Sequence, residues 1–312
     1  MNKKIYDFSG KKKIWFGLSL ALIALIIAFS VIRGVEIAIE FKGGTIITYS
    51  YEGDVKSSDV QSDIEALLET PVTIQQGENL SGDSKTFSIS FSYDQGLSSE
   101  KQNSLTSLMQ EKYPDSNFEV LDSNDVNPTS GREFFLKCVV AAILAAVLII
   151  LYIAWRFKKI SGWSAGVCAV IALIHNLVFV FGTFAVIGFE INSNFIAVIL
   201  TILGYSVNDT IVVYDRIREN KKIMPKASFT ELVNVSTSQS LTRSIRTSIT
   251  TVSTMIIVSV VAYIYGVESI LSFSVPMIVG MIAGTYASLC IASPLWVWWN
   301  ERKNAKTVKS KK

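Results

Sequence analysis

The sequence predicts an α-helical membrane protein with six membrane-spanning helices and a ferredoxin-like α+β domain inserted between the first two. Three observations predict this fold class. The 312-residue chain is 50% hydrophobic with a mean hydropathy of +0.39, which is too apolar for an ordinary soluble surface. Six apolar segments are each long enough to cross a bilayer, which takes about 20 helical residues. A long polar stretch, residues 33–132, separates the first apolar segment from the second.

The spans follow from the apolar runs in chain order. The first run continues too far for a signal peptide, and no small-residue cleavage site follows it. The last run exceeds the minimum length, so we expect it to tilt or to extend past the bilayer. The predicted spans are Ile14–Ile32, Phe134–Trp155, Gly162–Ile187, Phe195–Val213, Thr247–Tyr265 and Ile270–Trp299.

The distribution of charge predicts the orientation of these spans. Residues 33–132 contain 17 acidic and 7 basic residues, a net charge of −10. Lysines and arginines gather instead on the opposite side of a six-helix path, so both termini are expected in the cytoplasm and residues 33–132 outside. Basic residues beside a membrane suit anionic lipid headgroups, not nucleic acid. These basic clusters are Lys3–Lys13, Arg156–Lys159, Arg216–Lys226 and Arg302–Lys312.

Four parts of the chain are therefore expected. Residues 1–32 form the N-terminus and first span, and residues 33–132 form the extracytoplasmic domain. Residues 133–300 form the bundle of the remaining spans, with a cytoplasmic loop over 216–246, and residues 301–312 form a basic tail. Within that loop, Ser228 and Glu231 match a capping box, and the apolar residues after them predict a short interfacial helix.

The extracytoplasmic domain has the predicted element order βαββαβ, the split arrangement of ferredoxin-like folds. The third strand alternates cleanly, with Phe87, Ile89 and Phe91 on one face. The strands are predicted at Thr45–Tyr51, Val72–Gln76, Lys85–Ser92 and Phe118–Asp122, and the helices at Asp59–Glu69 and Glu100–Tyr113.

Asp209 lies inside the apolar fourth span, roughly 9 Å from its cytoplasmic end by helical rise. An ionised carboxylate at membrane depth costs roughly 2.5–3.5 kcal/mol, so it needs a protein partner, a wet cavity or a proton. A proton- or ion-coupling role is favoured, and a carboxylate hydrogen-bonded between helices is the alternative. Asn208 and Thr210 add polar contacts, while Gly204 and Ser206 would allow close approach of another helix.

Other polar residues at membrane depth are candidates for the same site. Arg243 and Arg246 precede the fifth span, where they either modulate the proton affinity of Asp209 or snorkel to the interface. His175, the single histidine, either relays protons or hydrogen-bonds a neighbouring helix. Two small-residue pairs favour close helix packing, Gly162–Gly166 and Gly280–Gly284.

Signatures of enzymes are lacking. The chain has no phosphate-binding G-x-x-x-x-G-K, no G-x-S-x-G and no H-E-x-x-H, so ATP is not expected as its fuel. Cys138, Cys168 and Cys290 fall in predicted spans, where they are expected to be small buried hydrophobes. No two of them stand at metal-ligand spacing, and neither a metal nor another cofactor is expected.

Three segments resemble the SecF family of protein-export membrane proteins. Residues 204–220 are similar to the fourth-span signature of that family, and residues 241–251 to its fifth-span entry. The segment from Arg33-Gly34 to Gly43-Gly44 resembles the one that follows the first span. The family usually has Asp-Phe-Thr-Gly-Gly where this chain has Glu40-Phe41-Lys42-Gly43-Gly44, so the acidic charge is kept and Lys42 is new.

The resemblance implies half of a transporter of the resistance-nodulation-division superfamily in the bacterial cytoplasmic membrane. Such a subunit pairs with SecD, associates with the SecYEG channel and uses the proton-motive force to help move unfolded secreted polypeptides outward. YajC and YidC are further candidate partners. In this resemblance Asp209 matches the proton-coupling aspartate, and Arg243 matches the functional arginine.

Two alternatives to this function remain. The first is an exporter of small molecules or lipids from the same superfamily, although such exporters usually carry both halves and larger domains. The second is a scaffold that stabilises the export channel without coupling ions, although a scaffold has no need of an ionisable group at Asp209. The carboxylate itself is compatible with H⁺ or Na⁺ as the coupling ion.

Overall fold

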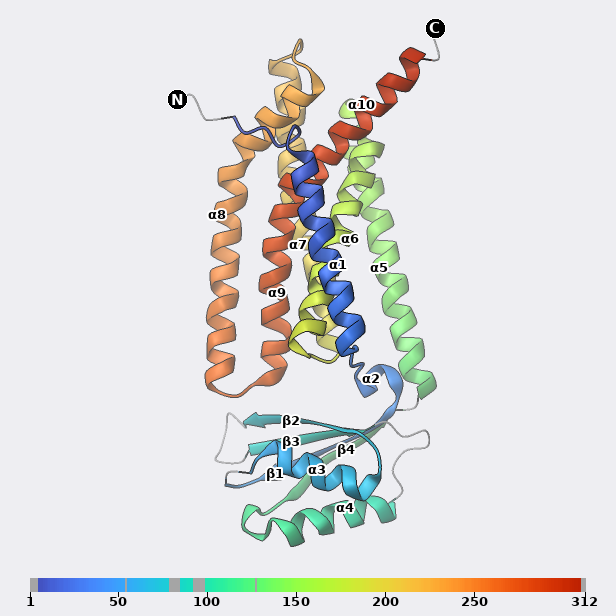
Figure 1. Ribbon diagram of the computed structural model, residues 1–312, viewed down its shortest axis with the longest axis vertical. Helices are drawn as coiled ribbons and strands as arrows, with labels where there is room; N and C mark the ends of the chain where they lie inside the picture. The colour runs from blue at the N-terminus through green and yellow to red at the C-terminus, as the bar shows by residue number, and fades with distance from the viewer. Residues whose placement is uncertain (1–4, 54, 79–84, 92–98, 127, 310–312) are drawn as a thin grey trace.

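A bundle of long helices stands on a small α+β domain in the computed structural model of the protein (Figure 1). The structure describes residues 5–53, 55–78, 85–91, 99–126 and 128–309. Within these residues, six helical stretches are long and apolar enough to cross a membrane, as predicted from the sequence. The first and last described residues lie at the end of the bundle away from the small domain (Figure 1).

The helices of the bundle differ in how much of their surface is covered. α6 and the sixth span, which runs from α9 into α10, are the most deeply buried and form the centre of the bundle. α1, α5 and α8 leave most of their apolar side chains exposed. Exposed apolar faces on a six-span bundle are available to lipid or to another membrane protein. The helices are α1 (Lys12–Arg33), α5 (Pro128–Arg156), α6 (Gly162–Ile187), α7 (Ser193–Ile223), α8 (Phe229–Ile264), α9 (Glu268–Ala287) and α10 (Ser293–Lys309), with a π-helical turn at Ser288–Ala292.

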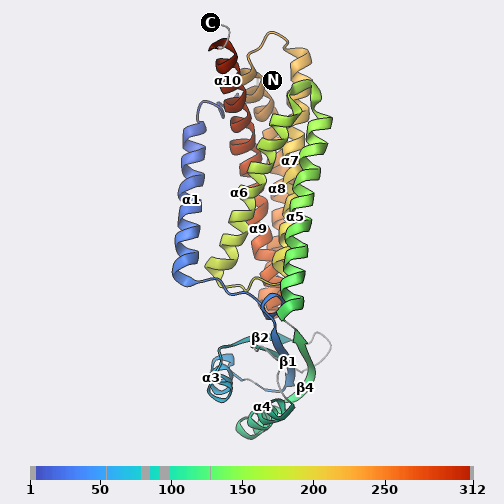
Figure 2. The ribbon, with the colours of Figure 1, turned by 90° about the vertical axis from the view of Figure 1, so that its right-hand side faces the viewer.

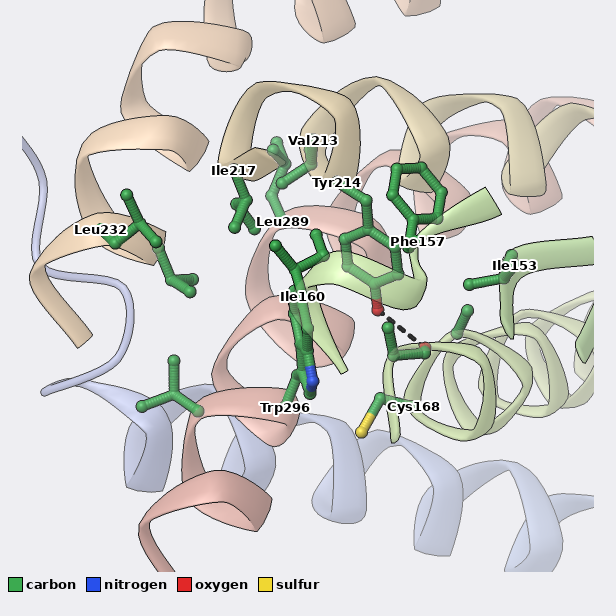
Figure 3. Close-up of a cluster of buried hydrophobic side chains, with 14 of the residues drawn as sticks. Ile153, Phe157, Ile160, Cys168, Val213, Tyr214, Ile217, Leu232, Leu289 and Trp296 are labelled. Atoms are coloured by element: carbon green, nitrogen blue, oxygen red, sulfur yellow. Dashed lines mark hydrogen bonds between the residues drawn. The ribbon is translucent and has the colours of Figure 1, made fainter. Parts of the chain in front are cut away.

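The connection between the fourth and fifth spans corrects the prediction of a loop over 216–246 with a separate interfacial helix. α7 continues to Ile223 and α8 begins at Phe229, so only a short turn lies between them. Ser228 does cap α8, because its hydroxyl accepts the Glu231 N–H at 3.2 Å. The apolar residues after this cap, including Leu232, are buried against Ile217 and the last helix instead of facing lipid headgroups (Figure 3).

The α+β domain between the first and second spans has the predicted ferredoxin-like arrangement. Its antiparallel sheet has the strand order β2-β3-β1-β4, and the sheet faces the bundle while α3 and α4 cover its opposite side (Figures 1 and 2). Phe87, Ile89 and Phe91 point into the core between sheet and helices, as their alternation predicts. The elements are β1 (Gly44–Tyr51), α3 (Ser57–Leu68), β2 (Val72–Glu78), β3 (Lys85–Phe91), α4 (Ser99–Lys112) and β4 (Glu119–Val126).

Candidate coupling site in the membrane bundle

Asp209 lies on α7 where α8 and α9 pack against that helix. Its side chain is buried, with Ser244 of α8 and Thr285 of α9 beside the carboxyl, and the charge of Arg243 acts on it. Yet Asp209 Oδ2 and Ser244 Oγ are both buried without a hydrogen-bond partner among the described residues. A buried carboxylate oxygen without a donor is rare in folded proteins and leaves a place for a proton.

A series of hydroxyl groups extends from this carboxyl toward the end of the bundle that lies beside the α+β domain. Thr285 Oγ1 hydrogen-bonds Ser248 Oγ of α8. The Tyr205 hydroxyl of α7 lies 3.4 Å from Ser248 Oγ and 3.0 Å from Thr251 Oγ1. Because each hydroxyl both donates and accepts a hydrogen bond, the series can pass a proton or hold water beside Asp209.

Thr210 and the neighbouring buried polar side chains hold α7 against α6 and α9. Thr210 Oγ1 lies 2.9 Å from Ser288 Oγ, which stands at the start of the π-helical turn. Asn176 of α6 donates to Ser206 Oγ of α7 at 2.6 Å, and both side chains are fully buried. Sequence reasoning missed the roles of Asn176 and Ser288, although an asparagine in an apolar span is itself a signal of a polar contact between helices.

Of the five glycines predicted to allow close helix packing, four do so within the described part of this chain and Gly204 does not. A Cβ on Gly280 would lie 2.8 Å from Ile202, and one on Gly284 would lie 3.2 Å from Ser206 Oγ, so both glycines stand where α9 crosses α7. Gly162 and Gly166 lie in the same way against the backbone of α5. Gly204, in contrast, has no described atom outside its own stretch of α7 within 4 Å of an added Cβ, so the close packing predicted for it is not made by the described residues.

Arg243 and Arg246 are exposed on the outer side of α8, and neither forms an ion pair with any residue that the structure describes. Arg243 does not reach Asp209 as a direct salt-bridge partner. Thr247, Thr250 and Thr254 continue the exposed polar stripe along α8 at helical spacing. Asn208 of α7 is exposed as well. A polar stripe at membrane depth is costly in lipid, so it indicates a surface that meets protein or water.

His175 connects α1 to the bundle and does not contact Asp209. Its Nε2 lies 3.1 Å from Ser19 Oγ of α1, and its Nδ1 lies 3.3 Å from Asn176 Oδ1. Ser19 Oγ is also 3.0 Å from the Tyr286 hydroxyl, which donates to the Trp15 carbonyl at 2.9 Å. These contacts fit the simpler of the two expectations, a histidine that hydrogen-bonds a neighbouring helix.

Across the described ranges of the chain, no group of three or more His, Cys, Asp or Glu side chains is arranged to hold a metal ion. Around Asp209 the structure places the hydroxyl groups of Ser244 and Thr285, and the charge of the Arg243 guanidinium acts on its carboxyl.

Comparison with known proteins gives a consistent family. The family model described as protein export membrane protein SecD/SecF, C-terminal, matches residues 106–302. The protein translocase subunit SecF of Thermobaculum terrenum is 34% identical over 91% of this chain and 91% of its own length. SecF of Petrotoga mobilis is 32% identical over 95% of this chain and 97% of its own.

Longer relatives contain the same unit as part of a larger chain. The protein translocase subunit SecDF of Bacillus subtilis is 32% identical over 96% of this chain but only 38% of its own length. The crystal structure of SecDF from Thermus thermophilus, described as a translocon-associated membrane protein, has a TM-score of 0.78 at 31% identity. That match covers 96% of this chain and 39% of the solved chain, so the present chain spans about two fifths of it.

Proposed function

Because the chain belongs to the SecD/SecF family of protein translocase subunits, we propose that it uses the proton-motive force to assist protein translocation across the bacterial cytoplasmic membrane. The observation that carries the proposal is the Asp209 carboxyl, which is buried at membrane depth with one oxygen lacking a donor. A carboxyl in this setting is stable when protonated and becomes costly when ionised, unless a positive charge or water approaches it.

The exposed side of the site, on α7 and α8, fits a transporter whose second half is supplied by SecD. The described residues leave the polar stripe on α8 exposed, together with Gly204 and Asn208 on α7. Relatives that join SecD and SecF in one polypeptide support an association of the same kind here. In our proposal the SecD half covers this side, and its approach and withdrawal change how strongly Arg243 and water stabilise the ionised form of Asp209.

The proposed cycle follows from this geometry. With Arg243 or water near, Asp209 is ionised, and it gains a proton when they withdraw. The hydroxyl series from Thr285 to Thr251 conducts that proton or the water that carries it. The supporting polar residues Asn208 and Arg246 are exposed, and in the proposal they face the partner half.

The proposed setting of this activity is the cytoplasmic membrane with both termini in the cytoplasm, as the charge distribution predicts. There the complex would associate with SecYEG, with YajC and YidC as accessory proteins, and act on unfolded secreted polypeptides. The extracytoplasmic domain would stand on the side where those polypeptides emerge.

Replacing Asp209 with asparagine tests the coupling role. Asp209→Asn keeps the shape of the side chain and removes its titration, so we expect normal membrane abundance with loss of export stimulation and proton flux. The matched control is Glu219→Gln, an exposed carboxylate later on the same helix that pairs with Arg216. Export of a secreted reporter at the unmutated level in Asp209→Asn cells would favour the scaffold. Replacing sodium in the medium by potassium separates H⁺ from Na⁺ coupling.

A further inference from the structure

The segment between α1 and the extracytoplasmic domain is fixed to the membrane bundle. Ile37 pairs with Ile191, in the connection between α6 and α7, as an isolated parallel bridge. The Ala38 N–H donates to the Ile191 carbonyl at 3.0 Å, and the Ile191 N–H donates to the Glu36 carbonyl at 2.8 Å. Backbone hydrogen bonds therefore hold the segment that leads to the domain against the connection between α6 and α7.

The short helix α2 (Ile39–Lys42) continues this attachment toward α5. Phe41 is buried, and its ring packs on Phe134 and Phe135 of α5 with centroid distances of 5.8 and 5.6 Å. Gly131, near the start of α5, lies so close to α2 that an added Cβ would be 2.8 Å from the Glu40 carbonyl oxygen. The entry to the domain and the exit from it are thus packed together at α2.

Glu40 extends this attachment to the helix that carries Asp209. One oxygen of its carboxylate, Oε2, accepts the N–H of Ser193 at 2.8 Å and also the Ser193 hydroxyl. Ser193 is the first residue of α7, so its N–H has no partner within the helix. The side chain of Asn192 accepts the next two N–H groups, those of Asn194 and Phe195. The negative charge of Glu40 also suits the positive end of the helix dipole.

The position of Glu40 in the chain places it between two functional parts. Asp209 lies on the same helix as Ser193, about 24 Å further along its axis by helical rise. On the other side, β1 begins at Gly44, directly after α2 and Gly43, which has a φ of 84°. β1 is a central strand that pairs with both β3 and β4, so a displacement of α2 is passed to the whole sheet.

We propose that Glu40 is a positioning residue that transmits movements of α7 to the extracytoplasmic domain. The inference rests on the proposed function, because it takes Asp209 as the group whose protonation repacks α7. When α7 moves, the Glu40–Ser193 contact carries α2 and β1 with it. Without that contact, proton exchange at Asp209 continues while the domain no longer follows.

Two variants remove the contact from opposite sides. Glu40→Ala removes the acceptor. Ser193→Pro removes both donors, and proline is well tolerated at the first position of a helix. Asn192 already has the extended backbone, φ −127° and ψ −169°, that a residue before proline prefers. Glu36→Ala is the matched control, because Glu36 contributes only its backbone carbonyl to the attachment.

The assay measures two quantities in native membranes at matched abundance of the full chain: proton flux, and export of a secreted reporter driven by the proton-motive force. For Glu40→Ala and for Ser193→Pro we expect driven export to fall about tenfold or more, the effect of losing hydrogen bonds to a charged group, with proton flux unchanged. The double variant should be no worse than either single variant, because both remove one contact. Glu36→Ala should leave both quantities unchanged.

Three results would overturn the inference. Driven export unchanged in Glu40→Ala would show that the contact transmits nothing. A parallel fall of flux and export would show a structural role only, and additive losses in the double variant would show that the two residues act separately. The failure of the proposed function has a different signature, since it would leave proton flux at the unmutated level in Asp209→Asn membranes.

Discussion

Replacing Ser244 measures how much the folded protein loses by burying an unpaired hydroxyl beside Asp209. Ser244 is 1% exposed, and its side chain lies close enough to the Asp209 carboxyl to act on it, but Oγ has no partner in hydrogen-bonding geometry among the described residues. An unpaired buried polar group costs about 1–3 kcal/mol, the desolvation that no partner repays. Alanine removes this hydroxyl and changes the volume by a single oxygen atom, so little cavity is left. We therefore expect Ser244→Ala to stabilise the folded protein by about 1 kcal/mol or more.

The matched control lies two turns earlier on the same helix. Ser236 is also fully buried, but its hydroxyl donates to the Leu232 carbonyl at 2.7 Å and accepts from Asn220 Nδ2 at 2.8 Å. Ser236→Ala leaves the Asn220 amide without that acceptor, so we expect a loss of about 1–3 kcal/mol. The same chemical change on one helix should thus have opposite signs at the two positions.

The measurement is the midpoint of thermal unfolding of the detergent-solubilised protein. Unfolding is monitored by the reaction of its buried cysteines with a thiol reagent. The midpoint should rise for Ser244→Ala and fall for Ser236→Ala. The stabilised Ser244→Ala variant should also be less active in driven export, because the hydroxyl beside Asp209 is lost. If Ser244→Ala lowered the midpoint as much as Ser236→Ala, the hydroxyl would have a partner and the account of an unsatisfied site would be refuted.

Three further predictions concern orientation, pH and the partner. In a cysteine-free background, Asn103→Cys should react with an impermeant reagent added to intact cells and Lys222→Cys should not; the reverse pattern would invert the topology. The Lys112 ammonium holds the pKa of the Asp63 carboxyl below its usual range, so this pair stabilises the domain above about pH 4 and the contribution is lost as pH falls through the folded-state pKa. Hydrogen exchange of α3 in the full chain should show that loss, and Asp63→Asn should flatten it. Gly204→Leu should leave this chain's abundance unchanged but reduce co-purification of SecD, since no other described part of the chain fills that space; undiminished co-purification would place the SecD surface elsewhere.

Much of the fold could be predicted because its signals are local. A run of apolar residues is costly in water wherever it lies in the sequence, and the alternation of Phe87, Ile89 and Phe91 defines one face of a strand without knowledge of its neighbours. The prediction of an interfacial helix after Ser228 was wrong because it, too, rested on local signals. A cap at Ser228 marks where a helix begins, but Leu232 has the same apolar character whether lipid or Ile217 covers it.

The candidate site was only partly predictable. Asp209 stands out because a carboxylate in an apolar helix is costly on its own account. Its neighbours Ser244 and Thr285 belong to two other helices, and the rotation of each helix depends on packing that sequence periodicity does not determine. The contact between Glu40 and Ser193 joins residues 153 positions apart, so no local pattern could indicate it.

The strand order of the α+β domain has a consequence for the biosynthesis of the protein itself. β1 is the first strand to be made, yet it pairs with β4, the last, in a register that brings Gly44 opposite Val126. Such distant pairing cannot form until the whole intervening segment is present, and it slows folding. In the proposed orientation, that segment crosses the membrane unfolded and completes its sheet outside, just before α5 enters the bilayer. In that orientation, the sheet of a translocase subunit can be completed only after its own polypeptide segment has been translocated.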